Sequence, residues 1–307
     1  MVAAVLPRAF VWKRVHSLMG LWLVLFLMEH LLTNSQAALW LGDRGASFVR
    51  MVNALHNLPY LEVIECTLLG IPLVLHMILG IQYAYKSKGN AHKTNGSSPS
   101  LPQYNRNRAY SWQRITSWIL LVLVIFHVVK FRFIDYPESV MTQEGIHYLV
   151  KVNKDPRLCT LAEQLHIRMY DNKAIEIEKK ELKQRSRIIS GKQTLSQAKD
   201  SYQLHQALVD KLIGMSVSSS QLILESKDFG AVTLMKVRET FQSPIYCIIY
   251  TIFVLATCFH AFNGLWTFIV SWGLVIRLVT QRAMLKWTIG LMVLIASLGL
   301  MAIWGSR

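Results

Sequence analysis

Hydrophobic residues in this chain are gathered into long blocks instead of alternating with polar ones. A bilayer needs about 20 mostly apolar residues per spanning helix. Five blocks reach that length, at roughly 15–40, 60–85, 112–134, 244–276 and 283–304. The pattern therefore predicts an all-α integral membrane protein built as a bundle of five transmembrane helices.

A long polar stretch separates the third apolar block from the fourth. It is mixed in charge and has a helical pattern in parts, for example over 172–187. We therefore expect transmembrane helices I–III within 1–136, a partly helical polar insertion over 137–243, and helices IV and V within 244–307.

The net charge of +15 over 307 residues would indicate a nucleic-acid partner if the protein were soluble. Its distribution indicates a membrane topology instead. Residues 135–243 hold 16 Lys/Arg against 14 Asp/Glu, whereas the rest holds 17 against 4, mostly beside the apolar blocks. Basic residues lie before the first block and after the second and fourth. The positive-inside rule then places the N-terminus in the cytoplasm, and the insertion and the C-terminus outside.

Composition agrees with this assignment. Hydrophobic residues make up 52% of the chain and its mean hydropathy is +0.31, both high for a soluble domain. We expect a multi-pass membrane protein that lies in a lipid bilayer and binds no nucleic acid.

Each of the first four blocks carries a histidine well inside its apolar run, namely His30, His76, His127 and His260, while His16 lies at the inner edge of the first block. Ionisable residues within a membrane are costly and point to function. A single intramembrane histidine is more often a packing residue, but one on each of four helices favours a common role.

Depth sorts these histidines into two pairs. With a rise of about 1.5 Å per residue, His127 lies about 5 Å below Lys130 and His30 about 6 Å below Asn34, both on the outer side. His260 lies about 24 Å from the outer start of its block, and His76 lies near the middle. We expect His30 to pair with His127 at an outer site and His76 with His260 at an inner one.

Two imidazoles on opposite sides of an iron porphyrin form a site suited to electron transfer, because no coordination position is left open. Helix-bundle interiors commonly hold such cofactors. The sequence therefore predicts two haems b. Gly20, Gly80 and Gly264 each follow a histidine by four residues on the same helix face, where they would make room for a porphyrin. Close helix packing is the alternative role for these glycines.

Several short motifs resemble the cytochrome b membrane-anchor subunit of succinate dehydrogenase or fumarate reductase, of the single-subunit, five-helix, two-haem type. The similarity covers roughly 10–134 and 236–304. The motifs are RVHSLMG over 14–20, EHLL over 29–32, HNLP over 56–59, SWQRIT over 111–116 and FHAFNGLW over 259–266.

The resemblance implies a set of ligands and partners. It implies that His30 and His127 ligate the distal, outer haem, and that His76 and His260 ligate the proximal haem. The chain would lie in the bacterial cytoplasmic (inner) membrane. A flavoprotein subunit and an iron–sulfur subunit would dock on its cytoplasmic face and interconvert succinate and fumarate. Electrons would then pass through the haems to a quinone, menaquinone in this subtype. The chain by itself would oxidise no succinate.

The sequence departs from that family at two places. The insertion, here 137–235, is far longer than the expected connection, and the resemblance implies no function for it. Some fumarate reductases carry a glutamate two residues before the last haem ligand, used in transmembrane proton transfer. Cys258 occupies that position here.

Polar residues near the two expected haems are candidates for further contacts. Haem propionates need cations or donors, although each such residue can also be a topology anchor. Inner candidates are Arg14, His16, Gln113, Arg114 and Arg282, and outer ones are Lys130 and Arg132. A quinone site needs a group that exchanges protons. The outer candidates are Glu29, Asn34, Arg50, His56, Glu62 and Glu65, with Glu29 favoured because it adjoins His30.

Two other functions remain open on the sequence. One is a haem cytochrome b anchor of another respiratory complex, such as a hydrogenase or a formate dehydrogenase, which would have a different helix count or ligand distribution. The other is a membrane transporter or channel whose histidines line a path, and it predicts no bound chromophore.

Overall fold

The computed structural model describes residues 6–87, 91, 101–190 and 196–307. Within this part of the chain, five helical segments are long and apolar enough to cross a membrane. They are Arg8–Ser35 (α1), Leu61–Lys86 (α3, Leu61–Ile64; η2, Glu65–Gly70; α4, Ile71–Lys86), Asn105–Ile134 (α5, Asn105–Val128; η3, Val129–Ile134), Pro244–Ser271 (α10) and Leu278–Trp304 (α11). The prediction of a mostly helical membrane protein with five spans is confirmed.

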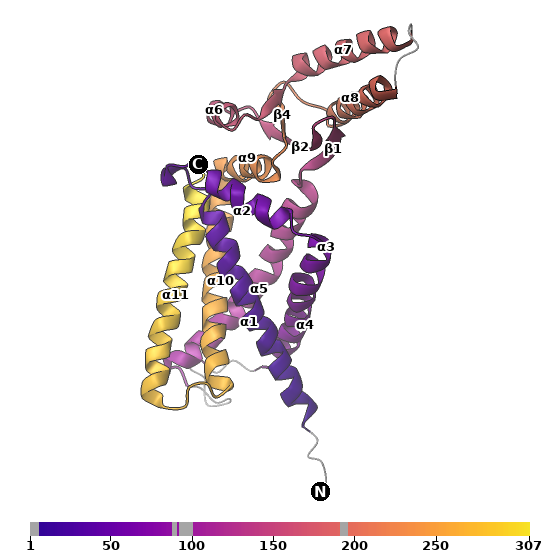
Figure 1. The fold of residues 1–307 in the computed structure, drawn as a ribbon. Coiled ribbons are helices and arrows are strands. Elements are labelled where there is room, and N and C mark those ends of the chain that lie inside the picture. Colours follow the sequence, from indigo (N-terminus) through magenta and orange to yellow (C-terminus); the bar gives the residue numbers. More distant parts are fainter. Residues whose placement is uncertain (1–5, 88–90, 92–100, 191–195) are drawn as a thin grey trace. The chain divides into compact units, whose positions relative to one another are not determined.

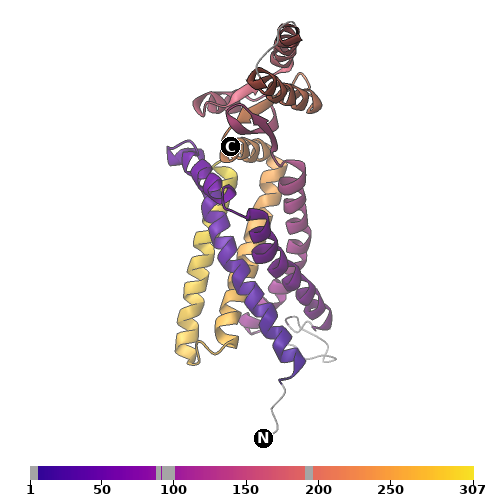
Figure 2. The same cartoon turned by 45° about the vertical axis from the view of Figure 1, so that its right-hand side comes forward.

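These helices form one compact unit, which comprises 1–35, 58–128 and 247–303. They lie alongside one another in two views of the fold (Figures 1 and 2). A Cβ added at Gly299 of α11 would lie 2.7 Å from a Val254 methyl of α10. Glycine therefore permits the close contact between these two helices.

Helix α4 accommodates a proline within the second span. Pro72 lacks an N–H, so the carbonyl four residues earlier, Leu68, loses its helical donor. The indole N–H of Trp22 on α1 donates a hydrogen bond to that Leu68 oxygen. The π-helical stretch η2 directly precedes this point. A neighbouring helix thus satisfies the freed carbonyl, as membrane prolines require.

The second compact unit comprises 36–57, 129–246 and 304–307. It contains the expected helices of the insertion and also a four-stranded antiparallel sheet that the sequence analysis did not predict, in the order β1-β2-β4-β3. Its elements are η1 (Leu39–Leu41), α2 (Ala46–His56), β1 (Glu138–Thr142), β2 (Gly145–Asn153), α6 (Pro156–Gln164), β3 (Arg168–Tyr170), α7 (Asn172–Ser190), α8 (Ser196–Gly214), β4 (Gln221–Ser226) and α9 (Phe229–Gln242).

Both faces of this sheet are covered, because successive side chains of a strand point to opposite sides. Val150 and Leu224 face a core shared with α6 and α9. Leu149 and Ile223 face a second core, shared with α8 and the start of α7. The insertion therefore has hydrophobic cores of its own.

The connection between the first two spans is part of this second unit. The Asn53 side chain on α2 donates to Asp228 and accepts from the Gly230 N–H at the start of α9. The buried Arg238 guanidinium donates to the main-chain oxygens of Ala37 and Arg44. Burial lowers the Arg238 pKa to about 10, so the side chain remains charged at neutral pH. Helix α2 is thus bound to the insertion by polar contacts.

Candidate functional site: two histidine pairs between the helices

The structure brings the four intramembrane histidines together as two pairs. The names outer and inner pair are kept for their expected sides of the membrane. The outer pair is His30 of α1 and His127 of α5, whose ring centres lie 5.9 Å apart with the ring planes at 84°. The inner pair is His76 of α4 and His260 of α10, at 6.3 Å and 82°. Each pair joins two helices, and the four histidines come from four different ones.

These separations match those of two imidazoles on one metal ion. A metal–imidazole bond is about 2 Å long, and the centre of a five-membered ring lies about 1 Å beyond the bonded nitrogen, given ordinary bond lengths. Two ligands on opposite sides of an iron therefore place their ring centres about 6 Å apart. Both pairs fit a haem iron by this measure.

Hydrogen bonds orient the inner pair through main-chain oxygens. The Nδ1 atom of His76 lies 3.1 Å from the carbonyl oxygen of His16 on α1. The Nδ1 atom of His260 lies 3.3 Å from the carbonyl oxygen of Gln113 on α5. Ligating histidines commonly donate their other ring N–H in this way, which leaves Nε2 free for the metal.

In the outer pair, side chains face Nδ1 instead of main-chain oxygens. The Nδ1 atom of His127 lies 3.3 Å from the Tyr250 hydroxyl on α10, which can accept the ring N–H. The Nδ1 atom of His30 lies 3.5 Å from the amide nitrogen of Asn34, one turn further along α1, and an amide nitrogen can only donate. In all four histidines, Nδ1 faces a hydrogen-bonding group of the protein.

Gly20, Gly80 and Gly264, the glycines expected beside a porphyrin, each lie next to a side chain at or near the inner pair. An added Cβ would lie 2.9 Å from His76 Cε1 at Gly20, 3.5 Å from His16 Cε1 at Gly80, and 3.6 Å from Gln113 Nε2 at Gly264. Gly20 is the tightest of the three, because it adjoins a ring of the inner pair. Porphyrin packing at these glycines stays a prediction.

The variant Gly20→Ala tests that contact. Its Cβ would force the His76 ring to move, so we expect about tenfold weaker retention of the inner haem. The measurement is haem content per chain during washing in detergent. Gly290→Ala on α11 is the matched control, because its added Cβ would meet nothing within 4 Å. Equal haem retention in both variants would contradict the expectation.

Several propionate candidates already bind other parts of the bundle. Arg14 donates to the Ser271 oxygen at the end of α10. Arg114 donates to the Ala84 and Ser87 oxygens at the end of α4. These contacts fit the alternative role of anchoring helix ends, although the assignment to propionates stays a prediction.

His16 and Gln113 have a different environment, because both touch the inner pair. The His16 ring stacks on His76 with centres 4.0 Å apart. The Gln113 side chain donates to the His260 oxygen and accepts from Asn263. Both residues therefore hold a histidine of the inner pair in place, which spacing in the sequence did not indicate.

The quinone-site candidates fall into both units. Glu29 is exposed on α1 and accepts from Thr33, while Asn34 contacts His30. Glu62 is exposed at the start of the second span. His56 belongs to the second unit, where its ring stacks on Phe229 at 3.8 Å and its Nε2 atom lies 3.1 Å from the Tyr148 hydroxyl. Their role at a quinone site stays a prediction.

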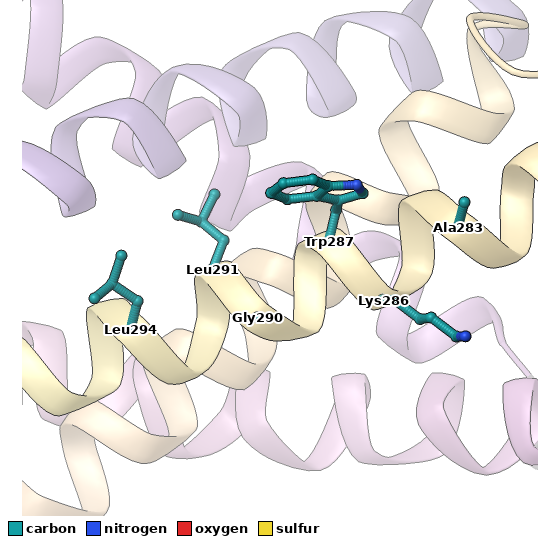
Figure 3. A pocket seen from close by; sticks show the side chains of 6 residues that line it. All are labelled: Ala283, Lys286, Trp287, Gly290, Leu291 and Leu294. Atoms are coloured by element: carbon teal, nitrogen blue, oxygen red, sulfur yellow. The ribbon is translucent and has the colours of Figure 1, made fainter.

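A groove runs along one face of α11 (Figure 3). Its lining residues come from this helix alone: Ala283, Lys286, Trp287, Gly290, Leu291 and Leu294. Because it is open and has one wall, and because none of the histidines lines it, it is a surface feature of the bundle and not part of the site above.

Comparison with known proteins gives one clear relative. Over 127 residues the chain is 33% identical to the succinate dehydrogenase cytochrome b558 subunit of Bacillus subtilis (strain 168). The resemblance to succinate dehydrogenase cytochrome b subunits is confirmed. The match covers 41% of this chain and 56% of that cytochrome b558 subunit, so the chain spans little more than half of the relative. No protein-family model and no solved structure matches the chain.

This relative also bears on location. A cytochrome b subunit is a membrane protein, and the five apolar helices agree with a multi-pass protein of the inner membrane. The expected location is therefore confirmed.

Proposed function

We propose that this chain is the dihaem cytochrome b membrane anchor of a succinate:quinone oxidoreductase. It relays electrons between an iron–sulfur subunit on the cytoplasmic face and quinone in the membrane, menaquinone or another. The observation that carries the proposal is the pair of interhelical histidine contacts, each with the ring separation of a bis-histidine haem. The similarity to a succinate dehydrogenase cytochrome b558 subunit supports the choice of complex.

The four histidines would hold two haems b, with the inner pair nearer the catalytic subunits. Haem supplies one-electron chemistry when it is bound. The chain's own residues hold each imidazole in a fixed rotation, through the His16 and Gln113 oxygens at the inner pair. They also exclude water from the ring faces within an apolar bundle.

Two sites at different depths are needed because the hydrocarbon core is about 30 Å thick. The N-terminus in the cytoplasm and the insertion outside belong to this proposal. Quinone would react at the outer end, where Glu29 is the favoured proton-exchanging group. Cys258, buried in α10, leaves no carboxylate at that position for transmembrane proton transfer.

Reduction of the chain by succinate tests the function. We expect a tagged chain purified from its own membranes to hold two haems b by pyridine haemochrome, with a flavoprotein and an iron–sulfur subunit bound. Added succinate should reduce haem in the complex, and dithionite should reduce both haems. Washing off the catalytic subunits is the control, since it should abolish reduction by succinate and leave reduction by dithionite.

Two other results of this experiment would favour the alternative functions. Haem that dithionite reduces and succinate does not, in the intact complex, would indicate the anchor of another respiratory complex. A colourless protein would overturn the haem assignment and favour the transporter or channel.

A further inference from the structure

Helices α5 and α10 each carry one histidine of a pair, and each also supplies a hydrogen-bonding partner to the histidine of the other helix. Helix α5 carries His127 of the outer pair and also supplies Gln113 to His260. Helix α10 carries His260 of the inner pair and also supplies Tyr250 to His127. Ten residues separate Tyr250 from His260, which is about 15 Å along the helix. Each helix therefore orients the histidine that the other one contributes.

The hydrogen-bonding partners differ between the two pairs. Both inner histidines face main-chain oxygens, which no substitution of a side chain removes. His127 instead faces a phenolic hydroxyl, and His30 faces an amide of its own helix. The partner of His127 thus comes from a neighbouring helix and can be removed by one substitution.

Tyr250 is held firmly at this position. Only 5% of the residue is exposed. Its ring meets His127 edge-on at 5.8 Å between centres, and Phe253 lies 6.0 Å away. The packing fixes the ring, so the hydroxyl stays beside Nδ1 of His127.

We propose that Tyr250 is the positioning residue of the outer haem, an assignment that rests on the proposed function. Its hydroxyl oxygen accepts the Nδ1–H of His127, which fixes the rotation of that imidazole and directs Nε2 to the iron. An acceptor at Nδ1 also makes the imidazole a stronger electron donor, and stronger donation stabilises the oxidised haem. Tyr250 thereby lowers the reduction potential of the outer haem relative to an unbonded histidine.

The variant Tyr250→Phe removes one oxygen atom and keeps the ring that packs on Phe253. We expect the potential of the outer haem to rise by about 59 mV, a tenfold change in the oxidised-to-reduced ratio for one electron. The potential of the inner haem should not change. The electron paramagnetic resonance signal of the outer haem, which depends on the imidazole orientations, should shift as well.

Tyr83→Phe is the matched control, because Tyr83 of α4 touches His16 with its ring edge at 5.3 Å and lies beside the inner pair. It should leave the outer potential unchanged. A second variant replaces Tyr250 by 3-fluorotyrosine, which keeps the ring and the oxygen but makes that oxygen a weaker acceptor. It should raise the outer potential by less than Tyr250→Phe does.

The experiment uses the assembled complex in a redox titration, after haem has been counted. Fewer than two haems in the wild type would overturn the proposed function. Two haems with an unchanged outer potential in Tyr250→Phe would overturn the role of Tyr250 alone, as would an equal shift of both haems. If Tyr250→Phe does not assemble, the 3-fluorotyrosine variant decides: a raised outer potential supports the role, and an unchanged one overturns it.

Discussion

The variant His127→Leu is expected to purify with one haem b per chain instead of two, and the missing one should be the outer haem. Leucine fills much of the space of the imidazole but offers no ligand, so His30 alone would hold the iron. His260→Leu should in turn remove the inner haem and leave the outer one. The measurement is the pyridine haemochrome count, with a redox titration to identify which haem remains.

Both variants should also lose succinate-driven quinone reduction, because a single remaining site cannot divide the crossing of about 30 Å of hydrocarbon into short steps. His205→Leu is the matched control, since His205 contacts Glu178 within the second unit. It should retain both haems. Two haems in His127→Leu would contradict the pairing, and loss of the inner haem alone would show that the depths are inverted.

The five spans could be predicted well from the sequence because the pattern that indicates a span is local. Twenty apolar residues define a span without reference to any other part of the chain. Depth along a helix follows from residue counts, and the structure places His30 beside His127 and His76 beside His260, as the depths indicated. The donor to the carbonyl that Pro72 frees could not be predicted, since Trp22 lies on another helix.

The sheet of the insertion could not be predicted in the same way. Strand β4 has a short apolar run, Leu222–Leu224, which by periodicity alone resembles a buried piece of helix. Its neighbour β2 lies about seventy residues earlier in the chain, so the pairing leaves no local signal. The alternation of Val150 and Val152 with polar residues was the one available hint.

Contacts between helices were missed for a related reason. Tyr250 and Gln113 follow no spacing rule relative to the histidines they meet, because the rotation of each helix decides which residues face one another. The binding of α2 to α9 through Asn53 also depends on the folded insertion. Such contacts can be identified only in the folded structure.

The insertion contains a buried carboxylate whose removal should lower the stability of the sheet. Glu225 of β4 is 1% exposed. It accepts hydrogen bonds from His147 Nδ1 at 2.5 Å and from the Tyr170 hydroxyl at 2.6 Å. Burial, together with the bond to Glu225, raises the Tyr170 pKa, so the phenol keeps its proton and remains a donor.

The variant Glu225→Ala leaves both donors buried without their acceptor. Such losses cost about 3 kcal/mol, which is about a hundredfold lower amide protection against hydrogen exchange. Exchange of the β2 and β4 amides, measured on the full chain, reports this directly. Glu144→Ala is the control, because Glu144 is half-exposed and its ion pairs with Lys227 and Arg168 lie at the surface. It should leave amide protection nearly unchanged.

Haem content should be unchanged in Glu225→Ala, because the four haem-binding candidates belong to the other compact unit. If protection falls equally in both variants, surface ion pairs and not the buried carboxylate stabilise the sheet. If Glu225→Ala alone loses protection and keeps both haems, the insertion is an independently stabilised domain whose polar network acts locally. The buried donors His147 and Tyr170 are then what makes the carboxylate indispensable, since without it neither can reach water.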